Sequence, residues 1–83
     1  MNKLETLQPQ IAIRDEEIFG YQVNIDNFKL AIRKIEKDYA DNPAMVEFKA
    51  RLEQLLQENQ TEQLKAIIIR DVIAEQVAEL EAS

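Results

Sequence analysis

The sequence has no cysteine, no histidine and no tryptophan, and its 83 residues include only one glycine and two prolines. Without cysteine there is no disulfide framework and no thiolate nucleophile. Without histidine, Ser-His and Cys-His catalytic pairs and the usual Cys/His zinc sites cannot be built. One glycine cannot form a glycine-rich phosphate loop. We therefore expect no enzyme, no cofactor and no metal site.

Long apolar runs are also missing. The longest covers residues 66–69, far short of the ~20 residues of a transmembrane helix, and the first residues show no apolar signal-peptide region. Ten basic residues stand against 16 acidic ones, which gives a net charge of −6 and a pI near 4.6. We expect an acidic, cytoplasmic protein that binds neither membranes nor nucleic acid directly.

Apolar residues recur at alternating steps of three and four through the first half of the chain. This is the heptad pattern of a helix that packs along a second helix. We predict a helix over residues about 3–40, in which only Arg14 breaks the apolar face formed by Leu4, Leu7, Ile11, Arg14, Ile18, Tyr21, Ile25, Phe28, Ile32, Ile35 and Tyr39.

A turn is predicted at residues 40–43, where Asn42 precedes Pro43. The residue before a proline is pushed away from helical geometry, and proline suits the first position of a new helix. Asn42 is therefore the expected cap of a second helix, because asparagine is favoured at that position.

The second helix is predicted over residues about 43–82. The stretch 57–63 is wholly polar, so a break near residue 60 stays open as an alternative. The predicted buried face consists of Met45, Phe48, Leu52, Leu55, Asn59, Glu62, Ala66, Ile69, Ile73, Gln76 and Leu80.

Two helices joined by so short a turn must be antiparallel. Residues 1–83 are thus expected to form one all-α domain, a long coiled-coil-like helical hairpin. The preferred register pairs Ile18 with Ile69 and Tyr21 with Ala66, and a register displaced by seven residues is the alternative. One buried polar residue can fix such a register, a role that we assign to Arg14, Asn59, Glu62 and Gln76.

A second fold is consistent with part of the sequence. Residues 19–25 alternate between apolar and polar side chains, as strands do, and Gly20 and Pro9 both disfavour a helix. A β-hairpin over residues 10–25 followed by two or three helices is the alternative fold.

The predicted hairpin leaves many apolar residues outside its buried faces. Contiguous exposed apolar patches mark interfaces, and a lone two-helix hairpin has little core. We expect a homodimer that forms a four-helix bundle, with a different protein as the alternative partner. The predicted interface consists of Phe19, Val23, Leu30, Leu64, Ile67, Ile68, Val72 and Val77.

Acidic residues near the C-terminus meet no basic residue in the sequence. Asp71, Glu75 and Glu79 are four residues apart and share a helix face. Such an acidic stripe could imitate a phosphate backbone. An acidic inhibitor that mimics nucleic acid and blocks a DNA- or RNA-binding protein is therefore the alternative to the favoured function, a non-enzymatic protein-interaction or assembly module.

Two short stretches carry a resemblance to known proteins. Residues 14–18 (RDEEI) and 21–28 (YQVNIDNF) resemble short helical proteins encoded by tailed bacteriophages and prophages. The resemblance implies a small accessory protein that acts in the bacterial cytoplasm on a host protein, and it assigns no functional residue.

Overall fold

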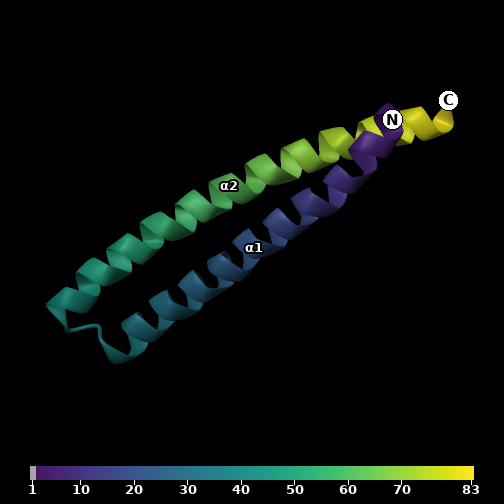
Figure 1. Ribbon diagram of the computed structural model, residues 1–83. Coiled ribbons are helices and arrows are strands. Elements are labelled where there is room, and N and C mark those ends of the chain that lie inside the picture. The colour runs from purple at the N-terminus through teal and green to yellow at the C-terminus, as the bar shows by residue number, and fades with distance from the viewer. Residues whose placement is uncertain (1) are drawn as a thin grey trace.

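The computed structural model describes residues 2–83 as two long helices. Helix α1 (Lys3–Asp38) and helix α2 (Pro43–Ala82) run antiparallel, with the connecting turn at one end and both termini at the other (Figure 1). The resulting rod measures 62 × 18 × 14 Å. The prediction of an all-α helical hairpin is confirmed. No strand occurs in residues 2–83, so the alternative β-hairpin over residues 10–25 is not supported.

An asparagine side chain caps the N-terminus of each helix. The Asn2 side chain accepts a hydrogen bond from the Glu5 N–H at 2.8 Å. The Asn42 side chain accepts bonds from the N–H groups of Ala44 (3.0 Å) and Met45 (3.3 Å), as its predicted capping role requires. These bonds satisfy N–H groups that lack partners within the helix.

Both helices continue through residues that disfavour helices or interrupt the apolar pattern. Helix α1 contains Pro9 in its interior, although proline removes one backbone hydrogen bond. Helix α2 is continuous from Pro43 to Ala82, without the break near residue 60 that the polar stretch allowed. Packing along a partner helix stabilises a helix more than local propensity does, which explains why these residues do not end it.

Gly20 lies on the exposed side of α1, and a Cβ atom added there would meet no neighbouring atom within 4 Å. Its backbone has no positive φ. Alanine is favoured over glycine in a helix interior by about 1 kcal/mol. We therefore expect Gly20→Ala to raise the melting temperature by about 4–8 °C, measured by circular dichroism at fixed protein concentration. An unchanged or lower value would contradict the exposed helical position of Gly20.

The buried face of α1 is the predicted one. Every predicted position from Leu4 to Ile35 is buried or half-buried, and Ile25 is the most buried at 3% exposure. Tyr39 is exposed instead, because α1 ends at Asp38 and Tyr39 belongs to the turn.

The buried face of α2 differs from the prediction along one of its two lines. The line Met45, Leu52, Asn59, Ala66, Ile73 and Leu80 faces α1 as expected. In the second predicted line Phe48, Glu62 and Ile69 are exposed, and only Leu55 and Gln76 stay half-buried. The residues one position later are all buried or half-buried: Lys49, Leu56, Gln63, Arg70 and Val77. Helix α2 is thus rotated about its axis relative to the prediction.

Hydrogen bonds between the helices join Arg70 to Asp15 and Gln63 to Gln22. These long side chains lie on one flank of the contact and reach along the helix axis, so the bonds do not identify the residues that face each other in the core. The register therefore stays a prediction. Ile69 is 44% exposed, so it does not pack in the core as predicted.

Candidate interaction surface

One flank of the hairpin is crossed by polar bridges between the helices. Their α1 members, Gln8, Asp15, Gln22 and Glu36, are spaced by multiples of seven and therefore share one side of α1. The bridges are Gln8–Glu81 (3.1 Å), Asp15–Arg70 (3.0 Å), Gln22–Gln63 (2.9 Å) and Glu36–Lys49 (3.6 Å). We call this side the polar flank.

Gln63 and Arg70 make the most specific of these contacts. The Gln63 amide also donates to the backbone carbonyl of Ile18 at 3.2 Å. The hydrogen bond that Arg70 donates to the Asp15 carboxylate raises the pKa of Arg70 above its ordinary value, with a further contribution from Asp71. A contact to a fixed backbone atom depends on alignment along the helix axis, so Gln63 helps to set the register.

The polar residues that were predicted to fix the register have different positions. Asn59 does lie between the helices, where its amide donates to the Leu55 carbonyl at 2.8 Å and its oxygen accepts from Asn24 at 3.3 Å. Glu62 is instead exposed and pairs with Lys65. Gln76 is half-buried and bonds within its own helix.

Arg14 occupies the buried face of α1, as predicted. Its guanidinium reaches Glu17 at 2.9 Å. Its Nε atom is buried and has no hydrogen-bond partner in residues 2–83. Arg14 is therefore an incompletely satisfied charge at the edge of the core, a costly arrangement.

The opposite side of the hairpin carries large apolar residues. Phe48, Leu55 and Ile69 are spaced by multiples of seven and follow one line of α2, next to its buried face. Phe48 and Ile69 are 48% and 44% exposed, and Leu55 is half-buried. We call this line the apolar flank. The sequence analysis placed these residues inside the hairpin, and the rotation of α2 brings them to its surface.

The outer faces of the helices carry most of the predicted interface. On α1, Phe19 is 70% exposed, and Val23 and Leu30 are also exposed. On α2, Leu64, Ile68 and Val72 are exposed and four residues apart, so they form one ridge. We call Leu64, Ile68 and Val72 the outer ridge.

Two predicted interface residues lie elsewhere. Val77 is only 8% exposed and belongs to the hairpin core, so its assignment to an external interface is wrong. The rotation of α2 that exposes the apolar flank is what buries Val77. Ile67 is half-buried at the edge of the core.

The acidic stripe continues the face of the outer ridge. Asp71, Glu75 and Glu79 are exposed, and Glu75 lies three residues beyond Val72, which places it on the same side of α2. Asp71 meets Arg70 at 3.4 Å, so its charge is partly compensated. The outer ridge thus has an acidic border toward the C-terminus.

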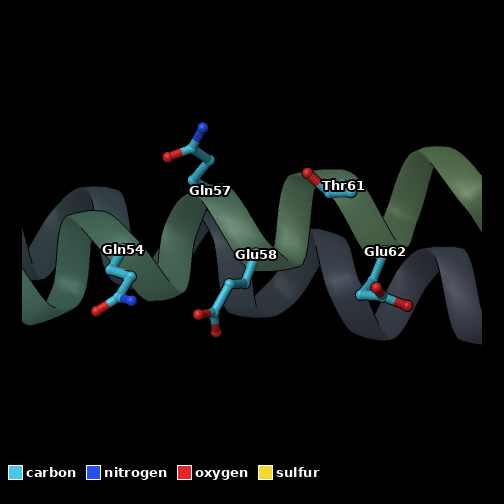
Figure 2. Close-up of a pocket in the computed structure, with 5 residues that line it drawn as sticks. All are labelled: Gln54, Gln57, Glu58, Thr61 and Glu62. Carbon is cyan, nitrogen blue, oxygen red and sulfur yellow. The ribbon is translucent and has the colours of Figure 1, made fainter.

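A shallow hollow on α2 is lined only by polar residues. It has a volume of about 370 Å³ and is lined by Gln54, Gln57, Glu58, Thr61 and Glu62. Figure 2 shows that all five side chains extend from α2, with α1 behind the helix. Amides and carboxylates from one helix give this hollow neither an apolar floor nor a basic group for binding an anion.

Metal and membrane sites are not found in the described chain. Residues 2–83 contain no cluster of three acidic side chains close enough to hold a metal ion. No helix in this range has an apolar stretch that could cross a membrane. Comparison with protein-family models, with curated proteins and with solved structures finds no match to this chain.

Proposed function

We propose that the protein is a non-enzymatic interaction module that presents an exposed apolar helix ridge to a partner protein. The observation that carries this proposal is the outer ridge of Leu64, Ile68 and Val72, with Ile68 56% exposed. Three apolar residues at helical spacing are the anchors by which a helix binds an apolar groove. Isolated exposed apolar residues are ordinary, whereas a contiguous row marks a contact surface.

The border of the ridge defines the chemistry of the partner. Glu75 and Glu79 are exposed next to the ridge and form no ion pair within residues 2–83. A partner with an apolar groove and basic residues along one rim would complement this surface. Charges at the rim chiefly speed association, and apolar burial supplies most of the affinity.

The resemblance of residues 14–28 to phage and prophage proteins supports a setting for this activity. In that setting the chain is an accessory protein in the bacterial cytoplasm, and its partner is a protein of the host.

Ile68→Glu is expected to abolish capture of the partner, because a charge would enter the centre of the apolar contact. The experiment uses the tagged protein as bait in a bacterial lysate, at low and high salt. The control combines Asp71→Asn, Glu75→Gln and Glu79→Gln, which removes the acidic border and keeps the ridge. This control should retain capture, and high salt should weaken capture only slightly.

The opposite pattern would support nucleic-acid mimicry. Capture that survives Ile68→Glu, disappears in the neutralised control and falls steeply with salt would show that acidic residues carry the affinity. Circular dichroism of both variants should show unchanged helicity, since all four substituted positions are exposed.

A further inference from the structure

The hairpin exposes more surface than a folded chain of its mass normally does. Its accessible surface is 6100 Å², whereas a folded monomer of 9.6 kDa is expected to expose about 5,100 Å². The excess, about 1,000 Å², is close to the ~800 Å² that each partner buries in an interface of standard size. Two helices alone bury little surface, and a second pair of helices would cover the excess.

The apolar flank extends the hairpin core outward. Leu55 lies three residues after the buried Leu52, and Ile69 lies three residues after the buried Ala66, so each is adjacent to the core on the helix surface. Helices of a four-helix bundle need an apolar stripe wider than the two lines that a simple hairpin buries. On α2 the apolar flank supplies that third line.

The acidic residues beside the apolar flank are compensated by basic ones. By heptad spacing, the α1 line beside the apolar flank contains Glu17 and Asp38, and the α2 line contains Glu62. Each of these carboxylates is paired within its own helix, in the ion pairs Arg14–Glu17 (2.9 Å), Lys34–Asp38 (3.0 Å) and Lys65–Glu62 (2.9 Å). The flank therefore has no uncompensated acidic residue along these two lines.

Symmetry then distinguishes between the two apolar surfaces. In a two-fold dimer the same patch of both chains meets itself. Self-contact through the outer ridge would place Glu75 and Glu79 of both chains, which form no ion pair within residues 2–83, at one interface. Carboxylates without a basic partner are unfavourable there. Self-contact through the apolar flank brings together surfaces whose acids are already neutralised.

We infer that two copies of this chain pack through the apolar flank of Phe48, Leu55 and Ile69 to form a four-helix bundle. Leu64 and Ile68 of the outer ridge stay exposed in this dimer and remain available to a different protein, whereas Val72 lies three residues after Ile69 and borders the apolar flank. The inference goes beyond the proposed function, because it uses a different line of α2 and holds whether or not the outer ridge has a partner.

The neighbouring residues Ile68 and Ile69 provide a matched test. Both are exposed isoleucines in the middle of α2, but Ile69 belongs to the apolar flank and Ile68 to the outer ridge. Sedimentation at tens of micromolar should give a dimer for the wild type and for Ile68→Glu, and a monomer for Ile69→Glu. In the partner-capture experiment the effects should be reversed, with Ile69→Glu retaining capture and Ile68→Glu losing it.

A second measurement covers the case in which Ile69→Glu does not fold. The melting temperature of a wild-type dimer rises with protein concentration, by about 3–6 °C for each tenfold increase at the combined size of two chains. A wild type that sediments as a helical monomer, with a concentration-independent melting temperature, would overturn the inference. So would a dimer that Ile68→Glu disrupts and Ile69→Glu does not. Loss of partner capture with unchanged sedimentation would contradict the proposed function and support the dimer.

Discussion

Ile25→Ala should destabilise the protein by about 2–5 kcal/mol, the usual cost of removing a buried isoleucine side chain in a core. Ile25 is the most buried residue of the hairpin at 3% exposure, and it lies near the middle of α1. A chain of this length has a total stability of about 4–12 kcal/mol. The substitution therefore removes a large part of it.

The measurement is urea unfolding, followed by circular dichroism at one protein concentration so that self-association affects both chains equally. Val23→Ala is the matched control, because Val23 is on the exposed side of the same helix and surface substitutions usually change stability by less than about 0.5 kcal/mol. Equal effects of the two substitutions would mean that the buried face of α1 has been assigned incorrectly.

The sequence was sufficient to predict the helices and the buried face of α1. Apolar residues on α1 outside that face are few and scattered, so one line of contact was clearly favoured. The boundary also followed from local chemistry, since Asn42 and Pro43 together define a helix start. These features depend on residues close in sequence, so the pattern of residues along the chain is enough to predict them.

The rotation of α2 could not be predicted in the same way. Phe48, Leu55 and Ile69 are more apolar than the Lys49, Gln63 and Arg70 that lie closer to α1. A pattern of apolar residues favours the first set. Long polar side chains can lie along an interface with their charged ends at its edge, and there they meet Glu36, Gln22 and Asp15 across the hairpin. Those pairings join distant parts of the chain, so spacing within one helix gives no signal of them.

The candidate interaction surface was predicted only in part, because it also depends on the rotation of α2. Leu64, Ile68 and Val72 stay exposed in either orientation of α2, because they lie far from both possible contact lines. Val77 and Ile69 lie on opposite sides of the line of α2 that faces α1. A small rotation of α2 about its axis therefore buries one of them and exposes the other. The apolar flank became visible only once the orientation of α2 was known.

Arg14→Leu should stabilise the protein by about 1–3 kcal/mol, the usual cost of a buried polar group without a hydrogen-bond partner. Arg14 interrupts the buried face of α1, its Nε atom is buried without a partner in residues 2–83, and Glu17 compensates its charge only at the edge. Leucine would continue the apolar line between Ile11 and Ile18 and remove the unsatisfied donor. Replacement of buried charges by apolar residues is often stabilising for this reason.

The control for this substitution is Arg33→Leu, at an exposed position of α1, where the same chemical change should have little effect. Both are measured by urea unfolding at equal concentration. Because a polar residue in the contact can restrict the alignment of two helices, Arg14→Leu should also loosen the register. Crosslinking of cysteines introduced at Gln22 and Gln63 by a flexible reagent that joins two thiols reports on that alignment, because these two side chains meet across the hairpin. A destabilised Arg14→Leu protein would show that the arginine contributes more through Glu17 than its buried Nε atom costs.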